Sequence, residues 1–376
     1  MITRQFQLEQ KSEYPLERDY DINRIIFFDI ETTGFAAEST YLYLIGCAYY
    51  KATGFELIQW FSEGIQEEAL LLSTFFDFLK DYDVIFHYNG TGFDIPYLLR
   101  KVKMFGLAYS FDNLLSVDLY KKISPYKKIF KLANFKLKTI EDFLNIPRED
   151  TFNGGELIQV YQSYLGKKHY EALRKSRDPM LTTTAPLESD ILLNQLLLHN
   201  KDDVKGLLLI CPILYYSDMF EKPIRILQAG IDEGKLNIRF EITAQLPVWL
   251  HSGDDLSYFS AHGNIAHLSV QVYEGELKHY YENYKDYYYL PAEDYAIHKS
   301  VAHYVDKDFR TKAKPSNCYV KKQGIFAPQY ELLIAPYFKI NYQDRISFSE
   351  VHTDFLLQEE NLERYVRHIL SHLVTG

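Results

Sequence analysis

A short apolar run that ends in two alternating acids constrains this chain more than any other feature. Residues 25–28 read Ile-Ile-Phe-Phe, which is typical of a buried strand, and Asp29 and Glu31 follow directly. Side chains two apart on a strand point the same way, so both carboxylates lie together at the strand end. Close anions near a core need a cation, and oxygen ligands favour Mg²⁺ or Mn²⁺. The pattern therefore predicts a metal site, although a solvated strand end could carry the same residues.

Two further segments place acids on predicted helices. An apolar strand at 83–87 runs into a glycine-bearing loop, and Asp94 falls in the first turn of the helix that follows. His199 and Asp203 are four residues apart in a helical stretch, so they share one face of that helix. Each acid alone has an ordinary alternative, because Asp94 could complement the helix dipole and Asp203 could be a surface residue.

Taken in order, the three segments resemble the motifs of the DEDD superfamily of 3′–5′ exonucleases, which has a ribonuclease H-like fold. The Asp-x-Glu pair at 29–31 matches the first motif of that superfamily. Asn89, Phe93 and Asp94 match the second motif, and Asp203 matches the last acid. Three motifs in this order, each in a compatible strand or helix context, are a stronger signal than any one of them.

A narrower resemblance extends the match between these motifs. The segments at 118–120, 137–141 and 153–156 resemble the YprB-like branch of predicted bacterial exonucleases. The resemblance covers roughly residues 20–215.

The resemblance implies hydrolysis of phosphodiester bonds in single-stranded DNA or RNA with two Mg²⁺ or Mn²⁺ ions. Asp29 would bridge both ions. Glu31 and Asp203 would complete the first ion site, and Asp94 would hold the second. Two competing hypotheses stay open: a non-catalytic nucleic-acid-binding module, and an endonuclease or structure-specific nuclease.

The residue before the last acid departs from the pattern of the superfamily. One branch places Tyr four residues before that Asp and another places His five before it, whereas His199 stands at the tyrosine spacing. We expect His199 to orient the attacking water or to take its proton. Asn89 is expected to fix the loop or to contact substrate, and Thr32 is expected to contact substrate.

A basic segment follows the second motif. Residues 121–138 contain seven lysines and no acid, interleaved with aromatic residues. Lys127, Lys128 and Lys131 could meet phosphates beside aromatic rings that stack on bases, as a single-strand groove requires. A solvated helix face would look the same.

Hydrophobic periodicity predicts an α/β domain over residues 1–215, with the mixed sheet of a ribonuclease H-like fold flanked by helices. The expected elements are strands at about 24–30, 41–50, 55–61, 83–87 and 115–119, and helices at about 66–81, 94–106 and 191–209. An exposed loop is expected at 177–186.

Residues 216–376 predict a smaller, tyrosine-rich, β-rich α+β domain of uncertain role. Alternation indicates strands at 236–242 and 267–273. The other expected elements are a helix at about 291–304, a basic hairpin at 310–322 and an amphipathic helix at about 354–373. Tyr287 and Tyr289 could form a substrate platform that stacks bases, or this domain could be a structural appendage.

Composition sets broader limits. The net charge of −10 argues against a protein that coats nucleic acid non-specifically. No apolar stretch is long enough to span a bilayer, and we expect a cytoplasmic protein, monomeric, with no membrane partner. Three widely spaced cysteines are expected to be reduced core thiols.

Overall fold

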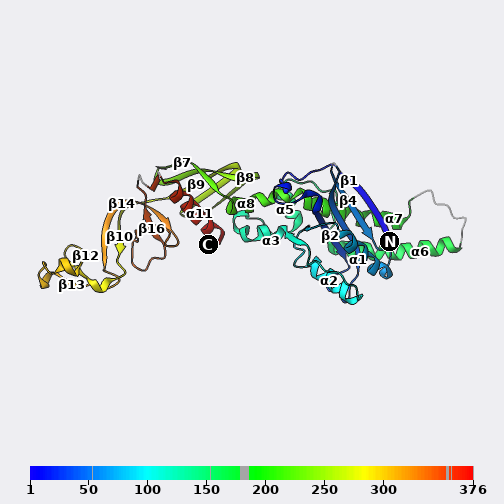
Figure 1. The fold of residues 1–376 in the computed structure, drawn as a ribbon, viewed down its shortest axis with the longest axis horizontal. Coiled ribbons are helices and arrows are strands. Elements are labelled where there is room, and N and C mark those ends of the chain that lie inside the picture. Colours follow the sequence, from blue (N-terminus) through cyan, green and yellow to red (C-terminus); the bar gives the residue numbers. More distant parts are fainter. Residues whose placement is uncertain (53, 153, 178–185, 353–354, 357, 376) are drawn as a thin grey trace. The chain divides into compact units, whose positions relative to one another are not determined.

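The computed structural model describes residues 1–52, 54–152, 154–177, 186–352, 355–356 and 358–375 (Figure 1). The chain forms two compact units. Unit 1 comprises Met1–Pro125 and Leu132–Tyr215, and unit 2 comprises Tyr126–Lys131 and Tyr216–Gly376. The short segment Tyr126–Lys131 therefore leaves unit 1 and packs with the second unit before the chain returns.

A mixed sheet of six strands lies at the centre of unit 1 (Figure 1). In chain order the strands are β1 (Ile2–Leu8), β2 (Ile25–Thr32), β3 (Leu42–Lys51), β4 (Gly54–Phe61), β5 (Val84–His87) and β6 (Leu115–Asp118). Their order across the sheet is β1-β4-β3-β2-β5-β6. The pairs β1–β4, β4–β3 and β3–β2 are antiparallel, whereas β5 pairs in parallel with β2 and β6 pairs in parallel with β5. The predicted mixed sheet is confirmed, and β1 is an edge strand that the sequence analysis did not predict.

Helices cover both faces of this sheet. They are α1 (Glu68–Leu79), α2 (Asp94–Met104), α3 (Leu119–Ile123), α5 (Leu137–Phe143), α6 (Gly154–Arg177) and α7 (Glu188–Leu209). α1 and α2 pack on the face that holds Phe28, and α6 and α7 pack on the face that holds Tyr43. The predicted ribonuclease H-like α/β class, with helices flanking the sheet, is confirmed.

One glycine allows α7 to lie close to the sheet. Gly46 of β3 pairs with Asp29 of β2. A Cβ atom at position 46 would lie 2.1 Å from Oδ1 of Asn200, so any larger residue would push the helix away. This close approach brings the polar part of α7 next to the acids of β2.

Unit 2 is built mainly from antiparallel strands. Three sheets have the orders β7-β8-β9, β12-β11-β13 and β10-β14-β16-β15. The strands are β7 (Ile224–Asp232), β8 (Lys235–Gly253), β9 (Ser257–Gln271), β10 (Tyr273–Tyr280), β11 (Tyr287–Leu290), β12 (Tyr295–His298), β13 (Thr311–Lys312), β14 (Tyr319–Gln329), β15 (Tyr337–Phe338) and β16 (Ser347–Glu350). Helices among its described residues include α4 (Lys127–Phe130), α9 (Lys299–Ala302) and α11 (Glu359–Thr375), and α8 (Leu214–Glu221) crosses from unit 1 into unit 2 at Tyr216. The predicted β-rich α+β class is confirmed, as are the two alternating strands.

The helix predicted at 291–304 is wrong. Residues 291–294 form a turn, Tyr295–His298 form β12, and only Lys299–Ala302 are helical. Asp294 has a left-handed backbone with φ 55° and accepts a hydrogen bond from the hydroxyl of Tyr289 at 2.6 Å. Acidic residues after a proline fit a tight turn as well as a helix start, and here the turn is stabilised by its tyrosine partner.

The basic hairpin predicted at 310–322 is also wrong. Lys312 lies in β13, which pairs with β11, whereas Lys321 and Lys322 lie in β14, which pairs with β10. The two halves of the expected hairpin therefore belong to different sheets. The final helix starts at Glu359, later than the expected position.

The tyrosines of β11 pack against a small core. Tyr287 and Tyr289 contact the cluster formed by Ala296, Ala313 and Cys318. The ring of Tyr287 also stacks on Tyr281, with centroids 4.4 Å apart. Both residues lie on one side of the strand, as expected, but that side faces the core of the small sheet, which argues against a base-stacking platform at these two rings.

Three remaining expectations concern loops, thiols and membranes. Most of the loop predicted at 177–186 lies outside the described residues. Cys47, Cys211 and Cys318 are buried and free. Within the described part of the chain, every helix is too short or too polar to traverse a lipid bilayer.

Candidate active site

Strand β2 presents both of its acids to the face covered by α7. Phe28 and Ile30 pack into the core beneath α1 and α2, so Asp29 and Glu31 project from the opposite face. Glu31 is buried, and its Oε1 lies 3.7 Å from Nε2 of His199 on α7. The strand therefore delivers two carboxylates to the helix that carries the third motif.

Asn200 connects α7 to the first of these acids. It is fully buried, and its Nδ2 donates a hydrogen bond to Oδ2 of Asp29 at 3.1 Å. Its Oδ1 accepts from Nε2 of Gln59 on β4 at 2.9 Å, which fixes the orientation of the amide. Asn200 and Gln59 were not predicted from the sequence, because buried amides carry no spacing signal.

Asp94 is the first residue of α2 and is buried. The loop before it is held by Asp118 at the end of β6, which accepts from the backbone N–H of Asn89 at 2.9 Å and from Oγ1 of Thr91 at 2.6 Å. Asn89 has a left-handed backbone with φ 59°, which asparagine tolerates. Asn89 thus shapes the loop that carries Asp94, and Asp118 is an anchor that the sequence analysis did not identify.

His199 is held from both sides of its ring. Its Nδ1 lies 2.6 Å from Oδ2 of Asp150, which is also buried. Its Nε2 lies 3.3 Å from Oδ2 of Asp203 and 3.7 Å from Oε1 of Glu31. The structure therefore aims Nε2 at two of the predicted metal ligands.

Arg148 is a second residue from the same loop that reaches the site. Its Nη2 contacts Oδ1 of Asp203 at 2.6 Å, and its Nη1 contacts Oε2 of Glu141 at 2.8 Å. The loop is fixed to α7 because Oδ2 of Asp202 accepts the backbone N–H groups of Glu149 and Asp150, each at 2.8 Å. Arg148 and Asp150 were not predicted from the sequence, since their partners are some 50 positions away and no local pattern links them.

Burial and mutual repulsion raise the pKa values of the acids on β2 and α2. Burial, together with the charges of neighbouring carboxylates, raises the pKa of Asp29 well above its ordinary value. Burial raises the pKa of Glu31 to about 8, although the nearby imidazole opposes the shift. Burial raises the pKa of Asp94 to about 7 against hydrogen bonds from backbone N–H groups. These three carboxylates are therefore difficult to ionise together without a cation.

On α7, in contrast, the surroundings of His199 and Asp203 favour the charged form of both side chains. Burial opposes charge on both His199 and Asp203, but their mutual contact outweighs it. The hydrogen bond to Asp203 and the charges of the surrounding acids raise the pKa of His199 to about 9. Contacts with His199 and Arg148 lower the pKa of Asp203. Asp203 is thus an ionised carboxylate between two cationic side chains.

The donor set fits a divalent metal ion. One ligand atom each from Glu31, His199 and Asp203 lie within 4.8 Å of one another. Asp29 and Asp94 interact electrostatically with this group and add further oxygen donors. Carboxylate oxygens suit Mg²⁺ and Mn²⁺, and an imidazole nitrogen is compatible with transition ions.

The other predicted site residues either serve the backbone of unit 1 or belong to unit 2. Oγ1 of Thr32 donates to the carbonyl of Gly34 at 2.8 Å and so closes the turn after β2. Lys127, Lys128 and Lys131 belong to the segment that packs with unit 2, where Nζ of Lys128 donates to the carbonyl of Thr375 at 2.9 Å.

The aromatic residues between those lysines also pack within unit 2. The ring of Tyr126 stacks on Phe220 with centroids 4.4 Å apart, and Phe130 is buried against Tyr216. These two rings therefore stabilise unit 2 and are not presented for stacking on bases.

Unit 1 presents an aromatic side chain close to the second sequence motif. Phe35 follows the turn after β2 and is 89% exposed. Its ring packs edge-on against Phe93, the residue before Asp94, with centroids 5.6 Å apart. The exposed ring of Phe35 was not predicted, because the sequence does not indicate whether a side chain in a turn is buried or exposed.

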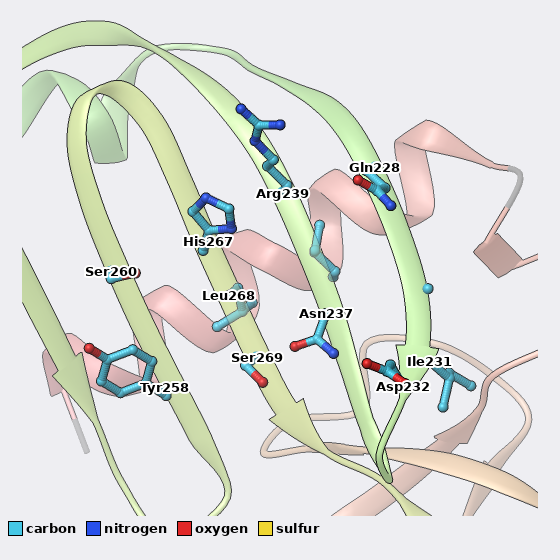
Figure 2. Close-up of a pocket in the computed structure, with 12 residues that line it drawn as sticks. Gln228, Ile231, Asp232, Asn237, Arg239, Tyr258, Ser260, His267, Leu268 and Ser269 are labelled. Atoms are coloured by element: carbon cyan, nitrogen blue, oxygen red, sulfur yellow. The ribbon is translucent and has the colours of Figure 1, made fainter.

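Unit 2 contains a hollow on the exposed face of its long hairpin (Figure 2). The hollow measures ≈ 500 Å³ and is lined by residues of β7, β8 and β9. Figure 2 shows Arg239 and His267 projecting from neighbouring strands, with Tyr258 and the acidic Asp232 nearer the other end. The hollow offers hydrogen-bonding groups, one aromatic ring and charges of both signs.

A comparison of the sequence with protein families matches the RNase_H superfamily over residues 26–215, which is half of the chain. The chain belongs to the RNase_H superfamily. The matched residues include all four predicted acids and His199, so the cluster described above lies within the superfamily domain.

Similar proteins include viral and archaeal DNA polymerases. The DNA polymerases of the Bombyx mori and Autographa californica nuclear polyhedrosis viruses are each 26% identical over 126 residues, covering 26% of this chain and 13% of the polymerase. The DNA polymerase of Methanocaldococcus jannaschii is 42% identical over 45 residues, covering 12% of this chain and 3% of the polymerase. This RNase_H superfamily chain thus spans a small part of the curated relatives that it matches.

Among solved structures, the family B DNA polymerase from Pyrobaculum calidifontis aligns with 68% of this chain and 33% of its own, at 14% identity. Its TM-score is 0.35, so the alignment adds nothing to the superfamily assignment.

Proposed function

We propose that this protein is a metal-dependent nuclease of the DEDD type, which removes nucleotides from the 3′ end of single-stranded DNA or RNA. The observation that carries the proposal is the convergence of Asp29, Glu31, Asp94 and Asp203 from three separate elements within an RNase_H superfamily domain. A binding module gains nothing from buried carboxylates that repel one another, whereas metal-dependent hydrolysis requires them. The matches to DNA polymerases support a nucleic acid as the substrate.

In this proposal the acids hold two divalent ions. Asp29 would bridge both, Glu31 and Asp203 would complete one site, and Asp94 would hold the other. Two bound ions supply an activated water and stabilise the leaving oxygen of an in-line displacement. Asn200 fixes the carboxylate of Asp29 through a hydrogen bond of 3.1 Å, and Asp118 fixes the loop that delivers Asp94. These contacts pre-organise the carboxylates, so little rearrangement is needed on binding.

Substrate contacts are proposed on two surfaces. The exposed ring of Phe35 lies beside the second motif and could stack on a terminal base. The hollow of unit 2, with Arg239 and His267, replaces Tyr287 and Tyr289 as the proposed substrate platform, because those tyrosines pack against a core.

The decisive assay compares end-labelled linear substrates with circular ones, in DNA and in RNA. We expect the wild-type protein with Mn²⁺ to shorten 3′-ended single strands, to leave circles intact and to stop when EDTA is added. Asp29→Asn should abolish the reaction, whereas the exposed Asp142→Asn should not.

Other outcomes of the same assay identify the competing functions. Cleavage of circular substrates would show an endonuclease. Tight binding of single strands by wild-type protein, with no cleavage under Mg²⁺ or Mn²⁺, would show a non-catalytic module and contradict the proposal.

A further inference from the structure

A histidine between two carboxylates is the feature of the site that the proposed function leaves without a role. His199 contacts Asp150 through Nδ1 at 2.6 Å and faces Asp203 and Glu31 through Nε2. Its side chain is 5% exposed, so it has little access to bulk water. A histidine in such an arrangement has one ring nitrogen fixed by its acid partner and the other directed at a cation site.

We infer that His199 is a metal ligand, positioned by Asp150, and that it makes one of the two ion sites selective for a transition ion such as Mn²⁺ over Mg²⁺. The inference rests on the proposed metal-dependent function of the same cluster. It assigns His199 a place in the coordination sphere, in contrast to the sequence expectation that it acts on the attacking water.

The distances support coordination by Nε2. Two ligand atoms at right angles around an ion, each about 2.1 Å from it, lie about 3 Å apart. Nε2 lies 3.3 Å from Oδ2 of Asp203 and 3.7 Å from Oε1 of Glu31, so a small adjustment places all three atoms around one ion. The three atoms come from two elements that Gly46 allows to approach closely.

The loop at 146–150 fixes two of these three ligands. Asp150 accepts the proton on Nδ1 of His199, so on metal binding the ring loses its other proton and Nε2 offers its lone pair to the ion. Arg148 binds Oδ1 of Asp203 at 2.6 Å, which leaves Oδ2 on the side of His199. Asp202 holds the loop in place through two backbone N–H groups. The two ligand atoms from α7 are therefore each oriented by a partner on the far side of the side chain.

The chemistry of the donor set gives the selectivity. Mg²⁺ prefers oxygen ligands and a near-octahedral shell, whereas an imidazole nitrogen raises affinity for later divalent ions. An all-oxygen site would discriminate less between Mg²⁺ and Mn²⁺. The second site, held by Asp29 and Asp94, lacks the imidazole and should show little preference.

The test measures binding of the metal alone to the full-length protein. Titration calorimetry with MnCl₂ and MgCl₂ is compared for wild type, His199→Asn and Asp150→Asn, with Glu149→Gln as the matched control. Glu149 is the exposed neighbour of Asp150, and its substitution removes the same charge from the same loop. Pulsed electron paramagnetic resonance of bound Mn²⁺ reports coupling to an imidazole nitrogen.

We expect nitrogen coupling in wild type and its loss in His199→Asn. Loss of the histidine should weaken the tighter Mn²⁺ site by roughly tenfold or more and Mg²⁺ binding by less. Asp150→Asn should weaken Mn²⁺ binding by roughly 10–100-fold, the usual effect of removing the partner of a metal-bound histidine. Glu149→Gln should bind as wild type, since an exposed charge is screened.

Two results would overturn the inference. Wild-type protein with bound Mn²⁺ and no nitrogen coupling would remove His199 from the coordination sphere. Equal Mn²⁺ affinities for Asp150→Asn and Glu149→Gln would remove the positioning role of Asp150. If Asp150→Asn does not fold, the wild-type spectrum and His199→Asn still decide the question.

The outcome is separable from the proposed nuclease activity. Nitrogen coupling without hydrolysis of any nucleic acid would leave the metal site standing and contradict the nuclease. If hydrolysis depends on Asp29 but bound Mn²⁺ shows no nitrogen coupling, the nuclease proposal stands and the assignment of His199 as a metal ligand is contradicted.

Discussion

Two adjacent aspartates of α7 have different partners. Asp202 accepts two backbone N–H groups from the loop at 148–150, whereas Asp203 contacts Arg148 and His199. Successive residues on a helix are rotated by about 100°, so neighbours in sequence face different surroundings. One acid therefore fixes the structure around the site while the other takes part in it.

The first prediction concerns the acid at the centre of the cluster. Asp29→Asn removes a buried carboxylate whose pKa is raised by burial and by its acidic neighbours, so the metal-free protein should become more stable. A gain of about 1 kcal/mol corresponds to roughly 2–4 °C in a domain of this size. Scanning calorimetry should also show that Mn²⁺ stabilises wild type but not the variant. A lower melting temperature for metal-free Asp29→Asn than for wild type would contradict the account of repulsion.

His87 supplies a pH-dependent prediction. Burial lowers the pKa of His87 to about 4, and its Nδ1 accepts the N–H of Gly90 at 3.0 Å, which suits a neutral ring. Between pH 6.5 and 4 the unfolded chain binds a proton that the folded protein does not, so stability falls as the pH falls. The loss should reach roughly 3 kcal/mol, at about 1.4 kcal/mol per pKa unit.

Urea unfolding at a series of pH values tests this prediction. His87→Asn keeps an acceptor for Gly90 and should flatten the profile in this range. His169→Asn changes an exposed histidine and should leave the profile as in wild type. Parallel profiles for wild type and His87→Asn would exclude His87 as the source.

At the scale of elements, the loop between α5 and α6 depends on α7 for its position. Asp202→Ala leaves the backbone N–H groups of Glu149 and Asp150 without their acceptor, at a cost of about 1–3 kcal/mol. Hydrogen exchange should speed up at these two amides while the strands of the sheet stay protected. Nuclease activity should fall as well, because the loop positions both Arg148 and Asp150. Unchanged exchange at 149 and 150 would show that other contacts hold the loop.

The elements also show what sequence could and could not predict. The meeting of the four acids was predictable, because each follows an apolar strand or lies on an apolar helix with fixed spacing, whereas their role as metal ligands stays a prediction. Arg148 and Asp150 were not, because their role depends on contacts with residues about 50 positions away. The turn at Asp294 shows a different failure, since its acids and proline favour a helix start and a tight turn alike. Local sequence patterns do not predict the structure where tertiary contacts decide between two local conformations that the pattern allows equally.

At the scale of the whole molecule, the path of the chain between the units limits which experiments are informative. Tyr126 and Phe130 belong to unit 2 although they precede the Leu132–Tyr215 part of unit 1. Truncation near residue 215 would expose both rings by removing Phe220 and most of their surroundings. Point substitutions in unit 2 are therefore a cleaner test of its role than deletion.

The corresponding prediction concerns the hollow of Figure 2. Arg239→Ala combined with His267→Ala should weaken binding of long single strands and reduce the salt dependence by roughly one unit of slope per lost phosphate contact. Cleavage of short oligonucleotides should be unchanged, because the four acids lie in unit 1. Lys278→Ala, on β10, serves as the control for loss of a positive charge. An unaltered salt slope in the double variant would mean that the hollow binds something other than nucleic acid.

The absence of a side chain at position 46 makes metal binding more sensitive than folding to a substitution at this position. A methyl group there would lie 2.1 Å from Oδ1 of Asn200 and force α7 outward. A helix can shift by some tenths of an ångström at moderate cost, but metal ligands must stay within about 0.2 Å of their places. Gly46→Ala should therefore keep a cooperative melting transition while its Mn²⁺ affinity collapses. Over evolutionary time, one nucleotide change at this codon could convert an enzyme of this kind into an inert relative that still folds.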